Sequence, residues 1–194
     1  PLRWIADRND TLPALVYPMV EAGCGVTWQV KPQPGSFVDE KGRPRKYICP
    51  AKDGSNISPS FIERRPITSA TRRVLVVEGT KQALAALTRT GDETAVYCIP
   101  GIQTWMGGED GPNPAFSRLK GQSVYIVPDA DAGSNRAVYD AANALGEHCK
   151  AWGASPVRFV RMPGHGSQGL DDVLASVDEG ERSEMLDLWI RQAQ

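Results

Sequence analysis

The sequence predicts an α/β fold with a mostly parallel sheet flanked by helices, and two patterns indicate it. From residue 72 onward, short continuous apolar runs alternate with segments whose apolar residues recur every three or four positions. Continuous apolar runs are typical of strands covered on both faces, and strands that alternate with helices form parallel sheets. In addition, acidic residues follow directly after two of the apolar runs.

The expected elements of this sheet follow one another in a regular order. Strands are expected at 74–77, 95–99, 123–127 and 157–160, with helices at 80–89, 135–152 and 183–192. The helix at 135–152 has the clearest pattern, because its apolar residues are three or four positions apart, as one buried face requires. The helix at 183–192 is amphipathic and is expected to close the domain.

Residues 1–70 have a different composition, which is rich in proline, glycine and polar residues. Two short strands are expected there, at 26–30 and 46–49, joined through a turn over 39–44 that contains glycine and proline. We therefore expect a small β-rich N-terminal extension over 1–70 and the α/β domain over 71–194.

The composition limits the class of protein. With 194 residues and a net charge of −1, the chain can bury one sizeable core, but its overall charge does not indicate nucleic-acid binding. The four cysteines are widely spaced, which argues against a zinc ribbon and favours a reducing compartment. Without a stretch as long as a membrane span or a signal-peptide pattern, we expect a cytoplasmic protein with no membrane partner. A start at Pro1 is typical of a fragment of a longer chain.

The acidic residues after the strands are the main functional signal. Glu78 follows the strand at 74–77, and Asp129 and Asp131 follow the strand at 123–127. The carboxyl ends of parallel strands meet at one edge of a sheet, so these side chains are expected to lie close together. Two like charges about 4 Å apart repel by roughly 4 kcal/mol at an effective dielectric of about 20, so three acids cluster stably only if they are protonated, solvated or neutralised by a cation. Oxygen ligands alone favour Mg²⁺ or Mn²⁺ over Zn²⁺.

Each acid also has a simpler interpretation. Glu78 could belong to an ordinary strand-to-helix turn near the positive end of a helix, and Asp131 could cap the helix that follows Gly133. Both acidic signals, however, are followed by a glycine, Gly79 or Gly133, and then by a helix. A helix N-terminus is a natural seat for a phosphate group, so both glycines are candidate substrate-binding residues.

Three segments resemble the signatures of the TOPRIM domain, which is shared by bacterial-type primases, type IA and type II topoisomerases and overcoming-lysogenisation-type nucleases. They are the run of residues 76–85 with Glu78-Gly79, the Pro-Asp-Ala-Asp-Ala-Gly run at 128–133, and the Gly-Leu-Asp-Asp-Val-Leu run at 169–174. The segment at 41–47 and the loop at 100–105 are similar to TOPRIM-bearing replication proteins of phages and plasmids.

The resemblance implies a TOPRIM-like, Rossmann-like sheet and assigns roles to the acids. It implies that Glu78 is a metal ligand or general acid/base, that Asp129 and Asp131 are the metal-binding pair, and that Asp172 is a further acidic contributor. Asp171 is an alternative to Asp172.

One position departs from the TOPRIM pattern. Gln82 stands where primases commonly carry an aspartate. A neutral side chain at this position weakens the expectation of a second or third metal ion.

By this resemblance, the expected activity is Mg²⁺-dependent nucleotidyl transfer in DNA replication by a primase-like protein of a phage or plasmid. The implied partners are single-stranded DNA and nucleotides, and a helicase or other replication domain in the same chain or as a partner. Two alternatives stay open. One is metal-dependent cleavage of a phosphodiester by the same acids, and the other is a non-catalytic module that binds nucleic acid or a partner protein.

Basic residues supply candidate phosphate contacts. Lys81 and Arg136 lie in the first turns of the helices that follow the acidic signals, where they either reach a bound phosphate or stay on the helix surface. A second group either grips a nucleic-acid backbone or forms a charged hairpin tip. Its members are Lys41, Arg43, Arg45 and Lys46.

Overall fold

The computed structural model describes residues 14–21, 25–38, 41–44, 47–48, 61–106 and 111–194. The chain divides into two compact units, Pro1–Ser58 and Pro59–Gln194. This division differs from the boundary expected at residue 70, because the strand β3 (Ile62–Arg65) pairs with a strand of the α/β domain.

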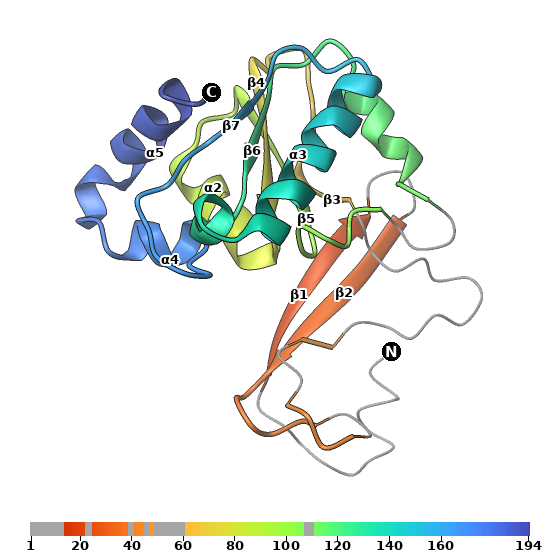
Figure 1. Cartoon of the computed structure of the whole chain (residues 1–194), viewed down its shortest axis with the longest axis vertical. Helices are drawn as coiled ribbons and strands as arrows, with labels where there is room; N and C mark the ends of the chain where they lie inside the picture. The colour runs from red at the N-terminus through yellow and green to blue at the C-terminus, as the bar shows by residue number, and fades with distance from the viewer. Residues whose placement is uncertain (1–13, 22–24, 39–40, 45–46, 49–60, 107–110) are drawn as a thin grey trace. The chain divides into compact units, whose positions relative to one another are not determined.

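The first unit contains a β-hairpin. Strands β1 (Ala14–Glu21) and β2 (Gly25–Pro32) pair antiparallel, with Ala14 opposite Pro32 (Figure 1). The strand predicted at 26–30 is confirmed within β2. Of the strand predicted at 46–49, residue 48 forms an isolated bridge with Val30, and residues 46 and 49 lie outside the described residues. β1 was not predicted, since Pro18 in its middle weakens the strand pattern.

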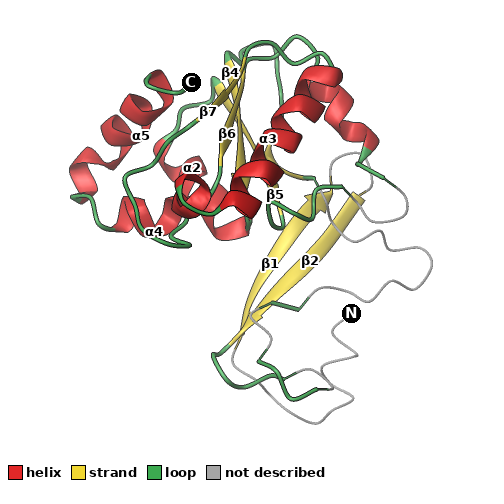
Figure 2. Cartoon of the chain, in the orientation of Figure 1, coloured by secondary structure: helices red, strands yellow, loops and turns green. Residues whose placement is uncertain are grey.

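The second unit is built on a sheet with the strand order β3-β5-β4-β6-β7. Its strands β4 (Arg73–Glu78), β5 (Thr94–Ile99), β6 (Val124–Val127) and β7 (Val157–Phe159) are mutually parallel, and only β3 runs antiparallel to its neighbour β5. Figure 2 shows these strands in the middle of the unit, with helices around them. The predicted mostly parallel α/β sheet is therefore confirmed.

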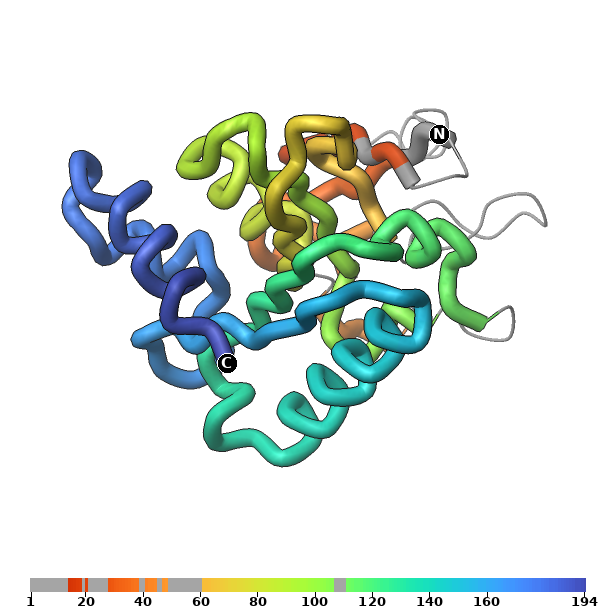
Figure 3. The backbone as a smooth tube through the Cα atoms, turned by 90° about the horizontal axis from the view of Figure 1, so that it is seen from above, coloured from red at the N-terminus to blue at the C-terminus, as the bar shows by residue number. Residues whose placement is uncertain are grey.

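The helices cover both faces of this sheet. α2 (Thr80–Arg89) lies against β3, β4 and β5, whereas α3 (Arg136–Ala151) lies against β6 and β7. The crossover from β4 to β5 and the crossover from β6 to β7 run in opposite directions across the sheet. Right-handed crossovers therefore place α2 and α3 on opposite faces, as Figure 3 shows. α4 (Leu170–Ala175) and α5 (Arg182–Arg191) pack on the α2 side.

Three 3₁₀ turns complete the described secondary structure of this unit, namely η2 (Pro114–Leu119), η3 (Ala130–Gly133) and η4 (Glu179–Glu181).

The core of the second unit is apolar and partly aromatic. All six residues of β5 are buried, and Phe61 stacks on Tyr97 and Phe116 with centroid distances of 4.6 and 4.1 Å. In the described part of the chain, no helix is long and apolar enough to cross a membrane.

The helix limits agree closely with the prediction. The helix predicted at 80–89 is confirmed at both ends as α2. The helix predicted at 135–152 is one residue shorter at each end, since Asn135 caps it by accepting a hydrogen bond from the Ala137 N–H at 3.1 Å. The helix predicted at 183–192 is confirmed as α5, shifted by one residue.

The strand order has a consequence for ligand binding. From β4 the chain crosses to β5 on one side of β4, and it later returns to β6 on the other side. The point between β4 and β6, at the carboxyl ends of the strands, is therefore a topological switch point, the usual place for ligands in open α/β sheets.

Candidate active site at the carboxyl ends of the strands

The parallel pairing of β4 and β6 brings the acidic residues to this switch point. Val77 stands opposite Val127 in the sheet, so Glu78 and Asp129 leave neighbouring strands at the same edge. The negative charges of Asp129 and Asp131 contribute to the raised pKa of Glu78, as expected for carboxylates that share one site. The structure thus places Glu78 and Asp129 at the ends of neighbouring strands, as predicted from parallel pairing.

Glu78 is partly buried and only partly satisfied. Burial is the main cause of its raised pKa. Two backbone N–H groups oppose that effect: Ile102, which donates to Glu78 Oε1 at 3.0 Å, and Asp129. The other oxygen, Oε2, is buried and has no hydrogen-bond partner among the described residues. Burying an ionised carboxylate oxygen without a partner raises the free energy of the folded state, unless another group neutralises the charge.

Gly79 makes the turn between Glu78 and α2. Its φ of 86° and ψ of 157° lie in a region that is open essentially to glycine alone. Its N–H donates to the Ile99 carbonyl at 2.7 Å, and its own carbonyl accepts from the Ala83 N–H at 3.2 Å, where α2 begins. The glycine after Glu78 therefore has a structural requirement in addition to its predicted role at a phosphate site.

Asp131 lies in η3, the short turn after β6. Its carbonyl accepts from the backbone N–H groups of Ser134 and Asn135 at 2.9 and 2.7 Å, which fixes the turn as far as the exposed Gly133 and beyond. Asn135 rather than Asp131 caps α3. The Asp131 side chain is thus not used as the helix cap, and its Oδ1 is buried without a hydrogen-bond partner among the described residues.

Gln82 belongs to the same site. It lies in the first turns of α2, is only 6% exposed, and donates from Nε2 to Asp129 Oδ1 at 2.6 Å. Its carbonyl oxygen, Oε1, is buried without a hydrogen-bond partner in the described part of the chain. In the sequence, Gln82 was notable only because it replaces an aspartate. Its place in the site could have been predicted from its spacing, because it lies four residues after Glu78, about one helical turn, at the start of α2.

The two adjacent aspartates of α4 have different surroundings. Asp171 forms an ion pair with Lys81, and the side chains of these residues are 19% and 35% exposed. Asp172 is exposed, and its Oδ2 accepts from the Gly169 N–H at 3.5 Å, at the start of its own helix. The structure therefore brings Asp171 to the α2 side of the site, and Asp172 stays at the N-terminus of α4.

The other predicted basic residues lie on surfaces. Arg136 is exposed in the first turn of α3, and its Nε donates to Asp140 Oδ2 at 2.8 Å. Of the basic group in the first unit, Lys41 and Arg43 are exposed, whereas Arg45 and Lys46 lie outside the described residues.

The donor atoms of the site suit a hard cation, although the carboxylates are not gathered into a metal-binding group. Three buried oxygens without hydrogen-bond partners belong to Glu78, Gln82 and Asp131, and oxygen donors of this kind are the ligands that Mg²⁺ and Mn²⁺ prefer. Within the described residues, no three His, Cys, Asp or Glu side chains are placed together so that they could hold a metal ion.

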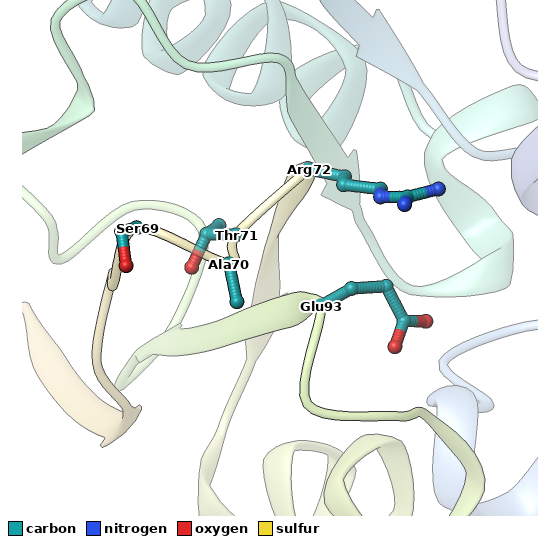
Figure 4. A pocket seen from close by; sticks show the side chains of 5 residues that line it. All are labelled: Ser69, Ala70, Thr71, Arg72 and Glu93. Atoms are coloured by element: carbon teal, nitrogen blue, oxygen red, sulfur yellow. The ribbon is translucent and has the colours of Figure 1, made fainter.

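A hollow of about 620 Å³ lies at the opposite edge of the sheet, beside the starts of β4 and β5. Its lining is formed by Ser69, Ala70, Thr71, Arg72 and Glu93. Figure 4 shows the Arg72 and Glu93 side chains extending to the same side of this hollow. Because it adjoins the amino-terminal ends of the strands, it is separate from the acidic site.

The mostly parallel sheet flanked by helices is a TOPRIM-like α/β fold, which solved structures of primases share. The chain matches a DnaG catalytic core with a TM-score of 0.60 and 17% identity, the E. coli primase catalytic core with 0.57 and 16%, and a DnaG primase catalytic domain bound to single-stranded DNA with 0.58 and 18%. Each match covers 93% of this chain, but the chain spans only about half of each primase structure, 53%, 52% and 52%.

The likeness at these identities is one of fold. No protein-family model matches the sequence, and no curated protein matches it. The predicted TOPRIM-like fold is confirmed by the solved structures.

Proposed function

We propose that this chain carries the catalytic site of a primase-like enzyme, which performs divalent-metal-dependent nucleotidyl transfer during DNA replication. The observation that supports this most is the placement of Glu78 and Asp129 at the ends of neighbouring parallel strands in a fold shared with DnaG catalytic cores. The buried, unpartnered oxygens of Glu78 and Asp131 add to this support, because a hard cation would satisfy both.

In this proposal, the site holds a nucleoside triphosphate by its phosphates. Glu78, Asp129 and Asp131 would hold Mg²⁺ or Mn²⁺, which would stabilise the negative charge that develops on the transferred phosphoryl group. The ammonium group of Lys81 and the N-terminus of α2 behind Gly79 would contact phosphate oxygens. The N-terminus of α3, with Arg136, would offer a second such contact.

The nucleic acid would be single-stranded DNA, and its binding would involve a local basic surface, since the net charge of −1 gives no general attraction. The exposed Lys41 and Arg43, with Arg45 and Lys46 in the same sequence group, are the candidates. A DnaG primase catalytic domain of the same fold has been solved with single-stranded DNA. A helicase or other replication domain, in a phage or plasmid context, would act with the chain.

The test is an assay with single-stranded DNA template, labelled nucleotides and Mn²⁺ or Mg²⁺. We expect labelled products longer than one nucleotide, and we expect Asp129→Ala and Asp131→Ala to abolish them. Asp92→Ala is the matched control, since Asp92 is exposed before β5, at the opposite edge of the sheet.

The outcomes of this assay distinguish the proposal from its alternatives. Shortened DNA in place of extended products would identify a nuclease that uses the same acids. DNA binding without either product, weakened in a Lys41→Ala/Arg43→Ala variant, would identify a non-catalytic module. Product formation that persists in the two aspartate variants would contradict the assignment of the site.

A further inference from the structure

We propose that Gln82 is a positioning residue, which holds Asp129 in place and limits the site to a single divalent cation. This inference rests on the proposed metal-dependent function and specifies how the site would take its cation. It is based on the contact from Gln82 Nε2 to Asp129 Oδ1 at 2.6 Å, and on the 94% burial implied by the 6% exposure of Gln82.

The chemistry of the two side chains fixes the direction of this contact. An ionised carboxylate only accepts hydrogen bonds, so the amide nitrogen of Gln82 must be the atom that faces Asp129. The amide oxygen, Oε1, is at the same end of the side chain and has no hydrogen-bond partner within the described ranges. A buried oxygen without a protein partner is normally bound by a cation or hydrogen-bonded to a water molecule.

The backbone holds the amide from a second direction. A Cβ atom added at Gly169 would overlap Gln82 Nε2, Cδ and Cγ, so the start of α4 passes directly against the Gln82 side chain. Nearby, the Ala130 N–H donates to the Gln168 carbonyl at 2.9 Å, which ties the loop before α4 to the residue after Asp129. Gln82 is therefore confined between Asp129 and the loop that leads to α4.

The neutral amide sets the charge of the site. Ionised Glu78, Asp129 and Asp131 carry three negative charges, which one divalent cation reduces to one. A carboxylate at position 82 would repel Asp129 in place of holding it, and would raise the total to four negative charges. Four negative charges would balance two divalent cations.

The test is a titration of the full chain with Mn²⁺, followed by calorimetry and by the electron paramagnetic resonance signal of free Mn²⁺. We expect one Mn²⁺ per wild-type chain. Gln82→Met should bind it about 10- to 100-fold more weakly, the usual effect of removing a group that orients a metal ligand. Gln82→Glu should bind a second Mn²⁺. Gln192→Met, an exposed glutamine at the end of α5, is the matched control and should bind as wild type does.

A metal-free measurement keeps the inference separate from the proposed function. In EDTA, a double-mutant cycle of Gln82→Met and Asp129→Ala, each of which removes the contact, should show a coupling of about fivefold or more in the unfolding equilibrium constant. If wild type binds no Mn²⁺ but the coupling is present, the proposed function and the single-cation limit are overturned, while the positioning role stands. Wild-type Mn²⁺ affinity in Gln82→Met together with no coupling would overturn the positioning role.

Discussion

The backbone N–H of Ile102 donates a hydrogen bond to Glu78 Oε1 at 3.0 Å and so joins the loop after β5 to the end of β4. This contact satisfies one oxygen of the carboxylate, while the buried Oε2 has no hydrogen-bond partner among the described residues. A buried carboxylate oxygen without a hydrogen-bond partner costs free energy when the group is ionised, so ionised Glu78 is expected to destabilise the native state.

We expect Glu78→Gln to raise the melting temperature of the metal-free protein at pH 8 and to abolish its stabilisation by Mn²⁺. The pKa of Glu78 is raised from 4.5 by burial and then by Asp129 and Asp131, so the native state binds more protons than the unfolded state above pH 4.5. Stability from this group is thus lost as pH rises through its folded pKa. The advantage of Glu78→Gln should be largest at pH 8 and shrink toward pH 4.5, in melts followed by circular dichroism.

The control for this prediction is Glu184→Gln, since Glu184 is an exposed acid in the first turn of α5. It should keep the wild-type pH profile and the wild-type response to Mn²⁺. A Glu78→Gln protein that melts below wild type at pH 8, or that Mn²⁺ still stabilises, would show that this carboxylate is neither strained nor a metal ligand.

The Lys81–Asp171 ion pair predicts opposite effects of its two residues on triphosphate binding. Lys81→Met should weaken binding about tenfold or more, because a charge-assisted hydrogen bond contributes about 1.5–3 kcal/mol. Asp171→Asn should strengthen binding about 1.4- to 5-fold, since it releases Lys81 from a partly exposed pair of about 0.2–1 kcal/mol. Both effects can be measured by calorimetric titration with inorganic tripolyphosphate.

Lys150→Met is the matched control for this titration, because Lys150 also has a carboxylate partner, Glu147 at 2.8 Å, on the exposed surface of α3. It should bind tripolyphosphate as wild type does. If Lys81→Met and Asp171→Asn change affinity in the same direction, the pair has a structural role at the α2–α4 contact and Lys81 is not a phosphate ligand.

Arg65 predicts a stability effect outside the site. Its guanidinium donates to the carbonyl groups of Leu87, Thr90, Gly91 and Thr94 at 2.7–3.2 Å, and so satisfies the C-terminal end of α2 from β3. We expect Arg65→Met to cost about 2–3 kcal/mol, which corresponds to about 4–12 °C in melting temperature for a chain of this size. Arg72→Met, at an exposed arginine, should shift it by less than about 2 °C. A loss from Arg65→Met as small as that from Arg72→Met would contradict this role.

Much of the fold could be predicted because the strands of the second unit are continuous apolar runs. β4 and β5 were placed to within one residue, and the acids at the ends of β4 and β6 followed from parallel pairing. β3 was missed, because Glu63, Arg64 and Arg65 make it look like a surface loop. Its charges are explained by partners distant in the sequence: Glu63 Oε2 accepts from Tyr97 at 3.0 Å and from Arg118 at 2.9 Å.

The composition of the site was harder to predict than its place. The sequence indicated Glu78, Asp129 and Asp131, whose order after strands is a local pattern. It did not indicate the contact from Gln82 to Asp129 or the pairing of Lys81 with Asp171, because these join residues 47 and 90 positions apart. Such contacts depend on how α2 packs against the turn after β6 and against α4, which only the tertiary structure fixes.

The environment of His148, on α3, predicts that acid destabilises the protein. Its Nε2 accepts from the Trp152 indole N–H at 2.8 Å, and its ring packs beside Trp105 and Phe116 with centroid distances of 4.9 and 5.0 Å. Burial lowers the pKa of His148 from 6.5, so below pH 6.5 the unfolded state binds more protons than the native state. The stability that neutral His148 contributes is therefore fully present above pH 6.5. It is lost as pH falls toward the lowered pKa, since a protonated Nε2 can no longer accept from Trp152.

We expect the free energy of unfolding in urea to fall less between pH 7.5 and 5.5 in His148→Phe than in wild type. His165→Phe, at an exposed loop histidine, should retain the wild-type loss. An identical loss in His148→Phe would show that this imidazole does not couple protonation to folding.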